Sequence, residues 1–556
     1  MTDQVGTPES KEPCFMIQDV SNVVGGMVKA SYQCIKEPQE EDAEKVAGPS
    51  TTEHANRSRS DSSATSTIQK GQSTDDVPSI GNVADHTAAP GKSGTVDKNG
   101  RTHYFSSRLV VQRRKVVWRF CFTVITFAIL IFTVFTLFWG SNAYTTRYYH
   151  RVKLLAVIQD DVYTPEMETV GIASLSTALE QIIPTVPGKW SIYNTISFNA
   201  KFNTSTPAEI DAKITERIYH EYYWVSINVR PNATAHLFQS IVNVSAPMFN
   251  STDVFQSVYE SGRDPTNMMS SIFPLMQQLE AKFAQYYVST YLPSLLHNIT
   301  AARPNTTAIN INMENIASSG RMSFGYIDHR PFTRRGLVTP TQVGLIDGLL
   351  LTVFQFLIYT PLHMEMAQLL NRKNFMVYRL AITVVTFFFI SLFYCAVAAI
   401  FNYDFTVAFG RGGFMVYWMS TWLYMVACGG ANENVVTLIV LHKPEYMGFW
   451  MMIFVALNLG PSFFPLVLNN VVYRYGYMMP IHNAMDLFKV IFLNTSRRHM
   501  GRNYGVLLAW IAVNTAIFPF VICWVDRVNK RRQAEAEAAA AAPTSLVLRD
   551  VATEKD

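Results

Sequence analysis

The sequence predicts an α-helical polytopic membrane protein with six transmembrane helices, one before and five after an α+β extracytoplasmic domain. Two observations predict this fold class. The apolar residues are concentrated in long runs that begin only after residue 115, and about 200 residues of mixed helical and strand pattern separate the first run from the others. Basic residues before the first run set the orientation of the whole chain.

The chain begins with a polar tail and a single apolar span. Residues 1–107 are rich in Ser, Thr, Asp, Glu and Gly, and they bury too little apolar surface to offset the entropy of ordering, so we expect a disordered cytosolic tail. The basic flank and first transmembrane helix occupy residues 108–139, where VVWRFCFTVITFAILIFTVFTLFW is long enough to cross a bilayer. No acidic residue falls between 101 and 119, whereas Arg113, Arg114 and Lys115 precede the span, which places its N-terminal side in the cytosol.

Residues 140–341 are then predicted to form a glycosylated extracytoplasmic α+β domain. KLLAVIQDD, SIYNTISFNAKFN and YYWVSINVR have the pattern of strands, and PAEIDAKITERIYHEY and DPTNMMSSIFPLMQQLEAKFAQYYVSTYLPSLL have helical periodicity. We interpret Asp160 and Asp161 as a turn after a strand in preference to a catalytic acid pair. Six Asn-x-Ser/Thr sequons agree with an extracytoplasmic location, and we predict N-glycosylation at Asn203, Asn232, Asn243, Asn250, Asn298 and Asn305.

Apolar runs return after Pro340, and residues 342–526 are predicted to form a five-helix transmembrane region. The expected spans are 343–362, 377–401, 414–441, 449–472 and 504–525. Six spans in all leave residues 527–556 as a cytosolic C-terminal tail, and the basic DRVNKRR after the last span agrees with that side. Arg497, Arg498 and Arg502 conflict with this count, because it places them outside the cytosol.

A carboxylate stands in the middle of the fourth span. Asn432, Glu433 and Asn434 follow Gly429 and Gly430 in YMVACGGANENVVTLIVL, and the two glycines predict a helix break at membrane depth. Two interpretations of Glu433 stay open. It is either a structural carboxyl bonded to a neighbouring helix or part of the polar lining of a translocation path or proton-coupling site.

Three further ionisable residues lie near predicted membrane segments. Asp347 is about one turn inside the second span, where an interfacial position is favoured over a substrate contact. Prolines interrupt the chain from 461 onward, and residues 473–496 are predicted to include a re-entrant or interfacial segment. Asp486 and Lys489 are three residues apart in the amphipathic AMDLFKVIFL, so they can pair on one helix face.

The sequence lacks the signatures of several function classes. A net charge of +4 from 46 basic and 42 acidic residues does not favour nucleic acid as a partner, and the six cysteines show no metal-ligand spacing. PGKSG has only the end of an ATP-binding P-loop, and no HExxH, G-x-S-x-G or GxGxxG occurs. We therefore expect no catalytic residue, metal or cofactor, and any uphill transport must draw its energy from a gradient or from a partner.

Several segments resemble a known family. WVSINVRPNATAHL (224–237), VGLIDGLLLTVFQF (343–356) and YRYGYMMPIHNAMDLFKVIFLNT with GRNYGVLLAWIAVN (473–514) resemble the fungal nitrosoguanidine-resistance membrane protein family. The plan of one span, a large outside domain and five further spans also resembles the membrane subunits of ABC-2-type exporters. The resemblance covers about residues 105–530 and implies a fungal membrane protein associated with resistance to toxic small molecules, with a homodimer as the expectation from the ABC-2 likeness. GGANEN matches no signature of the family.

Two functional hypotheses follow. The first is a protein that contributes to export of toxic small molecules or lipids, with its substrate path between the fourth span and its neighbours and Glu433 lining that path. The second is a non-transporting scaffold or regulator of lipid homeostasis that acts through partner membrane proteins. Both place the protein in the lipid bilayer of the plasma membrane or an endomembrane, with both termini in the cytosol.

Overall fold

The computed structural model describes residues 16–19, 31–34, 104, 109–161, 164–243, 245–302 and 313–541. The chain divides into two units, Met1–Ser93 and Gly94–Asp556. In the first unit, β1 (Met16–Asp19) and β2 (Ser31–Cys34) pair as antiparallel strands. The rest of the tail predicted for residues 1–107 lies outside the described residues, apart from Tyr104.

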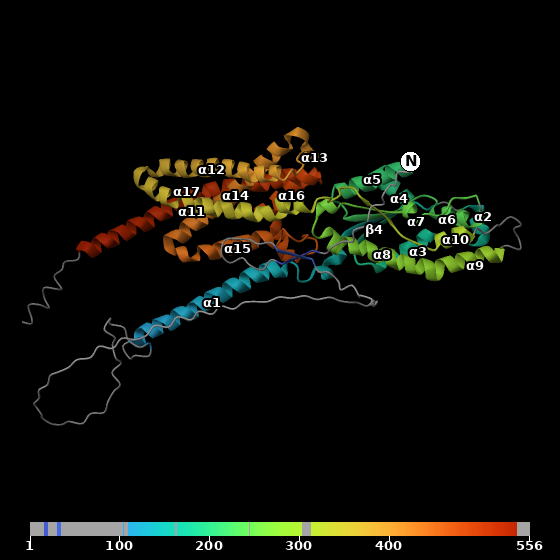
Figure 1. Cartoon of the computed structure of the whole chain (residues 1–556), viewed down its shortest axis with the longest axis horizontal. Coiled ribbons are helices and arrows are strands. Elements are labelled where there is room, and N and C mark those ends of the chain that lie inside the picture. The colour runs from blue at the N-terminus through green and yellow to red at the C-terminus, as the bar shows by residue number, and fades with distance from the viewer. Residues whose placement is uncertain are drawn as a thin grey trace, which may run out of the picture. The chain divides into compact units, whose positions relative to one another are not determined.

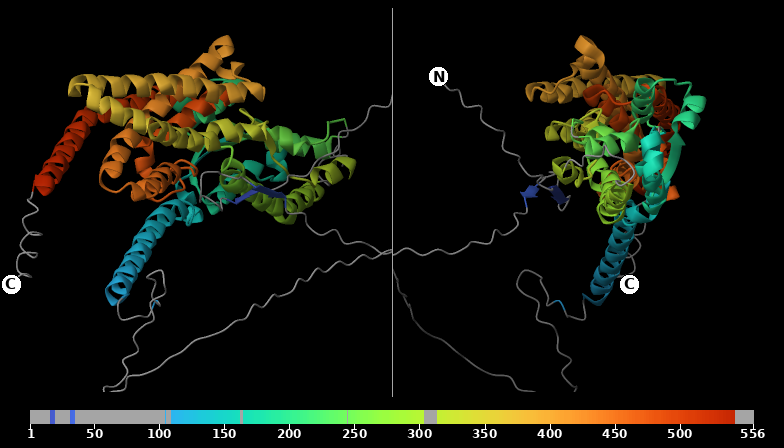
Figure 2. Two further views of the ribbon diagram at one scale, coloured as in Figure 1. Left: turned by 60° about the vertical axis from the view of Figure 1, so that its left-hand side comes forward. Right: turned by 90° about the vertical axis from the view of Figure 1, so that its right-hand side faces the viewer.

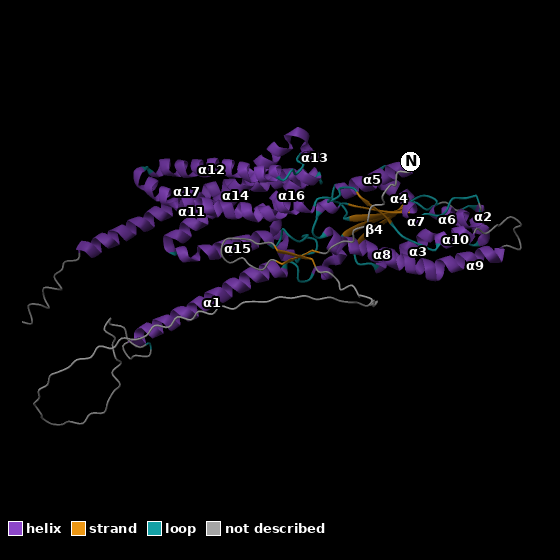
Figure 3. Ribbon diagram, viewed as in Figure 1, coloured by secondary structure: helices purple, strands orange, loops and turns teal. Residues whose placement is uncertain are grey.

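A five-stranded mixed sheet organises the region between the first and second membrane helices (Figure 3). β3 pairs in parallel with β4 and β5, β5 pairs antiparallel with β6, and β6 pairs in parallel with β7. Most connections between parallel strands contain helices, as such pairs require. The order across the sheet is β4 (Lys189–Asn194), β3 (Lys153–Ile158), β5 (Val225–Val229), β6 (Phe255–Tyr259) and β7 (Gly325–Asp328).

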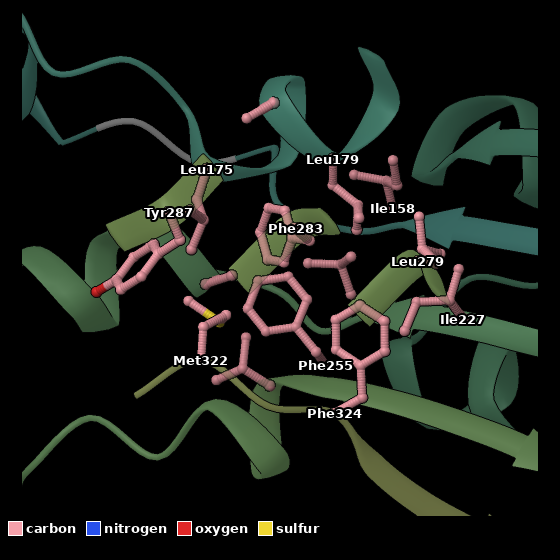
Figure 4. Packing of buried hydrophobic residues seen from close by; sticks show 14 of the residues in the cluster. Ile158, Leu175, Leu179, Ile227, Phe255, Leu279, Phe283, Tyr287, Met322 and Phe324 are labelled. Carbon is pink, nitrogen blue, oxygen red and sulfur yellow. The ribbon is translucent and has the colours of Figure 1, made fainter. Parts of the chain in front are cut away.

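Helices pack against both faces of this sheet. Alternate strand residues such as Ile227 and Phe255 join Leu279 and Phe283 in the larger core (Figure 4). The helices that contribute to this core are α2 (Pro165–Val170), α3 (Leu175–Ile182), α6 (Ala233–Val242), α8 (Phe273–Tyr286) and α9 (Leu292–Ala302). On the other face a smaller core joins Leu155 to Phe198 of α4 (Thr195–Phe202) and to α5 (Pro207–Tyr219). The short helices α7 (Ser251–Val254) and α10 (Met313–Ser319) complete the domain.

This region does contain a mixed sheet with helices packed on it, but one of the predicted strands is a strand over only part of its length. The alternating segment 191–203 is a strand only to Asn194, after which α4 begins. The Asn194 side chain accepts a hydrogen bond from the Ser197 N–H at 2.9 Å, and the Ser197 hydroxyl accepts one from the Asn194 N–H at 3.1 Å. This reciprocal cap satisfies two free backbone donors, so it starts a helix where the alternation of apolar residues predicts a strand.

Asp160 has the structural role that the sequence favours. Its buried carboxylate, directly after β3, accepts hydrogen bonds from the hydroxyl of Thr234 at 2.5 Å and from the hydroxyl of Ser176 at 2.7 Å. It also accepts the Thr234 N–H at 3.1 Å. The carboxylate thus ties the end of β3 to α3 and α6, whereas Asp161 is exposed.

Within the described part of the chain, five helices are long and apolar enough to cross a membrane. They are α1 (Val110–Gly140), α11 (Gly344–Leu369), α12 (Arg372–Ile400), α14 (Gly413–His442) and α17 (Met500–Ala541). Figure 1 shows α11, α12, α14 and α17 gathered in one bundle with α16 (Pro480–Leu493), and the two further views in Figure 2 show the same grouping. α1 packs along α15 (Met447–Leu459), where Leu130 and Val134 contact Ala456. The four-residue helix α13 (Thr406–Phe409) precedes α14.

The span predicted at 449–472 is wrong as a single helix. α15 (Met447–Leu459) has 13 residues, which gives a length of about 20 Å, too short to cross the hydrocarbon core of a bilayer. Gly460, Pro461 and Pro465 follow it, and a proline removes a helix hydrogen bond and clashes with the preceding turn. The chain then passes through η12 (Val471–Met478) into α16 (Pro480–Leu493). The predicted count of six spans is therefore not confirmed.

The two short helices α15 and α16 together return the chain across the bundle. α14 and α17 run parallel, because Ser420 bonds Tyr504 near their starts and the Leu441 carbonyl accepts from Arg532 near their ends. The chain must travel back between these helices. α15 covers the first part of this return path. α16 covers the second part, and the two helices meet where the Ile481 N–H donates to Asn458 Oδ1 at 3.3 Å. The end of the bundle that contacts the α+β domain, where Thr495 accepts a hydrogen bond from the domain, is called the domain side below, and the opposite end the tail side.

Candidate functional site

The helix break predicted at Gly429 and Gly430 is wrong. α14 continues without interruption from Gly413 to His442. The two glycines instead allow neighbouring helices to approach closely. A Cβ on Gly429 would lie 2.2 Å from the Phe387 ring of α12, and one on Gly430 would lie 3.0 Å from Asn514 Cβ of α17. Glycine at both positions therefore permits packing that any larger residue would obstruct.

The three polar residues that follow point to different neighbours. Successive residues of an α-helix are about 100° apart around its axis. Asn432 accordingly contacts α11 and α15, Glu433 contacts α12, and Asn434 contacts α17. All three side chains are buried. The sequence Asn-Glu-Asn thus joins α14 to four surrounding helices at one level of the bundle.

Glu433 forms a buried ion pair with Arg379 of α12. The Arg379 Nε donates to Glu433 Oε1 at 2.8 Å, and a terminal guanidinium nitrogen lies 2.7 Å from the same oxygen. The hydroxyl of Thr383, one turn along α12, donates to Glu433 Oε2 at 3.1 Å. Arg379 is 4% exposed and Glu433 5% exposed. Both charges are therefore shielded from water, and the geometry supports a paired, hydrogen-bonded carboxylate.

Aromatic rings surround the guanidinium of this pair. Its central carbon lies 5.5 Å from the ring centroid of Phe518, 5.6 Å from that of Phe356 and 5.7 Å from that of Phe375. These rings come from α17, α11 and α12. The ring faces attract the cation, but they also exclude the water that would otherwise solvate it. The buried Arg379 charge therefore depends on its carboxylate partner.

The two asparagines hold the remaining helices. Asn432 donates from Nδ2 to the Thr352 hydroxyl at 2.8 Å and accepts from the Trp450 indole at 3.0 Å. Asn434 donates to the Asn514 carbonyl at 3.0 Å, while its Oδ1 is buried and has no hydrogen-bond partner among the described residues. An unpaired buried acceptor is costly, so this atom is a place where a water or a ligand group would be bound favourably.

A small crevice, lined mostly by apolar atoms but including the polar groups of Glu433 and Asn434, lies over this face of α14. Its volume is about 50 Å³, room for one or two water molecules. Apolar and polar side chains together line the crevice. They come from α12 (Leu380, Thr383, Val384), α14 (Val426, Gly430, Glu433, Asn434) and α17 (Ile511, Asn514, Thr515, Phe518). We call it the polar crevice.

The other predicted site residues lie elsewhere. Asp347 is exposed on α11, and no hydrogen bond or ion pair joins it to Glu433 in the described part of the chain. Asp486 and Lys489 do meet on one face of α16, with Lys489 Nζ 3.7 Å from the carboxylate. That pair is a separate cluster from the one around Glu433.

Sequence reasoning missed Arg379, the partner of Glu433. An arginine inside the predicted span 377–401 was the available signal, because an ionisable residue within a span requires a partner. The contacts of Asn514 could not be found in this way, since an isolated asparagine in an apolar segment does not indicate which helix it faces.

The predicted glycosylation sites differ in exposure. Asn203, Asn243 and Asn250 are exposed, and Asn232 and Asn298 are half-buried. The Asn298 amide donates to the Gly171 carbonyl at 3.0 Å, so that nitrogen is engaged in the fold. Asn305 lies outside the described residues.

Comparison with known proteins gives the family. The chain belongs to the family described as "Protein of unknown function (DUF3533)", whose profile matches residues 123–516. The chain is 50% identical over 453 residues to an uncharacterized endoplasmic reticulum membrane protein of Saccharomyces cerevisiae, an alignment that covers 81% of this chain and 87% of the relative. No solved structure matches. These matches show a membrane protein of that family, and they do not name the nitrosoguanidine-resistance family or the ABC-2 plan.

Proposed function

We propose that this membrane protein moves lipids or small amphipathic toxic molecules along the polar crevice, without an ATPase of its own. The observation that carries the proposal is a carboxylate and two amides gathered at one level between α12, α14 and α17. Polar groups inside a membrane are costly, and where they occur they commonly mark a substrate or ion path.

The discontinuous crossing by α15 and α16 supports the same proposal. Non-helical backbone at membrane depth is tolerated only where protein or a water-filled cavity covers it, and transporters often bind substrates beside such interrupted helices. The plan of one helix, a large domain and further helices is similar to that of ABC-2-type exporters, and a homodimer would follow from that likeness. Since the sequence has no P-loop, an ion gradient or a partner protein would supply the energy.

Passage of a molecule requires the crevice to widen. A volume of about 50 Å³ admits water but no lipid chain or drug-sized molecule. The Arg379–Glu433 pair ties α12 to α14, and Asn434 ties α14 to α17. In the proposed mechanism these contacts hold the closed state, and movement of α12 away from α17 exposes the carboxylate and the unpaired Asn434 Oδ1 to the substrate.

Flux measurements on purified protein in liposomes test this proposal. Labelled toxicant and fluorescent phospholipid would be followed with and without proton and sodium gradients, for wild type, for Glu433→Gln combined with Arg379→Gln, and for Asp347→Asn as the matched control. We expect flux above empty vesicles for wild type and the control, and a loss of at least about ten-fold for the neutral double variant. Wild-type flux equal to that of empty vesicles under every gradient would overturn the proposal.

A second candidate is a non-transporting scaffold or regulator of lipid homeostasis. It is favoured by the observation that Asn432, Glu433 and Asn434 each already have a partner on a neighbouring helix, as residues that only hold a bundle together would. This alternative expects no flux in liposomes, together with a change in the cell's toxicant resistance when the chain is deleted.

The yeast relative is described as an endoplasmic reticulum membrane protein, which suggests the same membrane as the location of this chain. We propose that the α+β domain faces the lumen and that both termini face the cytosol. Endoglycosidase treatment should then increase the electrophoretic mobility of the protein. The shift should shrink when Asn203, Asn243 and Asn250, the exposed sequons, are replaced by Gln. A protease added to the cytosolic side of intact microsomes should leave the domain undigested, and digestion of the domain there would contradict this orientation.

A further inference from the structure

Charged side chains meet at the domain side of the bundle, away from the polar crevice. Asp486 of α16 lies 3.7 Å from Lys489 Nζ and 3.9 Å from His482 Nε2 on the same helix, and 3.9 Å from a guanidinium nitrogen of Arg502 on α17. We call His482, Asp486, Lys489 and Arg502 the basic cluster. All three distances exceed that of a hydrogen bond, so the carboxylate holds its basic neighbours loosely.

The basic cluster has more positive than negative charge. From residue 470 to residue 505 the sequence contains five Lys and Arg residues and one acidic residue, Asp486. The Lys489 side chain is 11% exposed, and Asp486 is its only ion-pair partner among the described residues. Arg502 donates to the Asn503 side chain at 3.2 Å and has the same distant carboxylate. Two permanent cations thus share one carboxylate, which leaves capacity for a second anion.

Two other arginines of this segment, Arg497 and Arg498, are engaged in packing. Arg497 donates to the Ala408 carbonyl and lies 4.8 Å from the Phe409 ring. Arg498 donates to the His220 carbonyl of the α+β domain at 3.3 Å. These two contacts explain two of the three arginines that conflict with the positive-inside rule, because both join segments of the fold. Among the described residues, Arg502 makes no hydrogen bond to another segment of the fold, only to the adjacent Asn503 side chain.

Exposed apolar side chains on the neighbouring turn indicate that the cluster lies near the membrane boundary. In η12, Val472 is 68% exposed and Met478 is 66% exposed, and Tyr477 of the same turn is also exposed. The Arg502 guanidinium lies 5.1 Å from the Tyr477 ring. Exposed apolar residues beside a tyrosine and a cation are typical of the boundary between the hydrocarbon core and the headgroups.

We propose that the basic cluster binds a phosphate group, carried by an anionic phospholipid of the domain-side leaflet or by free phosphate. Lys489 supplies a compact charge and Arg502 a planar fork of donors, and both bind phosphate oxygens well. Asp486 holds the two cations near each other when the site is empty. This site is independent of the crevice and of any transport.

Binding by full-length protein in detergent micelles tests the site with two probes. Native mass spectrometry would count bound phosphatidic acid and phosphatidylinositol, with zwitterionic, net-neutral phosphatidylcholine as the competitor, and equilibrium dialysis would measure radiolabelled inorganic phosphate. Lipid binding without phosphate binding assigns the site to a lipid headgroup. Phosphate binding with the same dependence on the variants below assigns it to the free ion, and binding of neither overturns the proposal.

Variants with opposite expected effects separate binding from folding. Replacing Lys489 and Arg502 by Gln should weaken binding about five-fold for each cation removed, about 25-fold together, since each contributes ~1 kcal/mol near an anionic surface. Asp486→Asn removes the competing carboxylate and should tighten binding by about the same five-fold factor. Lys213→Gln, on the exposed side of α5 where Lys213 pairs with Glu216, is the matched control and should bind as wild type does. Weaker binding by Asp486→Asn, or equal binding by all variants, would overturn the proposal.

Discussion

The buried pair between Arg379 and Glu433 allows one prediction to be worked out from the contacts. Both side chains are at most 5% exposed, and three aromatic rings lie within 6 Å of the guanidinium carbon. Glu433→Gln leaves that guanidinium without a counter-charge, and breaking a buried pair in this way costs about 3–5 kcal/mol. Arg379→Gln should cost a similar amount, because it leaves the carboxylate supported by the Thr383 hydroxyl but no cation.

The double variant should behave differently. With Gln at both positions, no charge remains buried and the two amides can bond each other across α12 and α14. Removing both charges of a buried ion pair avoids the large cost of leaving one of them buried and uncompensated. We therefore expect the double variant to lose less free energy of unfolding than either single variant, which is the signature of direct coupling in a double-mutant cycle.

The assay is reversible unfolding in mixed micelles of dodecyl maltoside and SDS, followed by tryptophan fluorescence. Asp347→Asn is the control, because an exposed substitution should change the free energy of unfolding by no more than about 0.5 kcal/mol. If the losses from Glu433→Gln and Arg379→Gln simply add in the double variant, the reasoning is refuted. Additive losses would mean that leaving either charge unpaired has no cost of its own.

Three further predictions use the same measurement of the free energy of unfolding. Gly429→Ala places a methyl group 2.2 Å from the Phe387 ring and should cost about 1–3 kcal/mol, whereas Gly505→Ala in α17 meets no atom within 4 Å and should be neutral or stabilising by up to about 1 kcal/mol. Asp160→Ala leaves two hydroxyls and a backbone N–H without their acceptor and should cost at least about 2 kcal/mol, with Asp160→Asn costing less. Burial raises the pKa of Glu260 above its ordinary 4.5, so the folded state binds this proton more tightly than the unfolded chain does, and the resulting stability is lost as pH rises from 4.5 through the raised pKa. Glu260→Gln should remove this decrease in the free energy of unfolding with pH. Parallel plots of the free energy of unfolding against pH for wild type and variant would contradict the prediction.

Long apolar runs were enough to locate most of the membrane helices. α12 and α14 begin and end within a few residues of the expected spans, because about 20 consecutive apolar residues have few alternatives to a membrane helix. The segment after Met447 could not be resolved in this way. Its prolines indicated an interruption, but they did not show that α16 would resume the crossing started by α15 at the level of Asn458.

In the α+β domain, the local pattern predicted some elements and missed others. β3, β5 and α5 follow from apolar periodicity. β6 and β7 were not predicted. Both are short strands, of five and four residues, and β7 is an edge strand, so each depends on pairing with a strand that is distant in sequence. Strand propensity is weak without such a neighbour.

The sequence by itself determined that this is a membrane protein with several long apolar helices, and that Asn432, Glu433 and Asn434 lie inside one of them. Hydrophobic length and periodicity are local properties, so they can be read along the chain. Only the tertiary structure decided that α14 is unbroken, that its three polar residues face different helices, and that Arg379 is the partner of Glu433. The reason is geometric: each residue turns the side chain by about 100°, and what it then meets depends on which helices pack alongside.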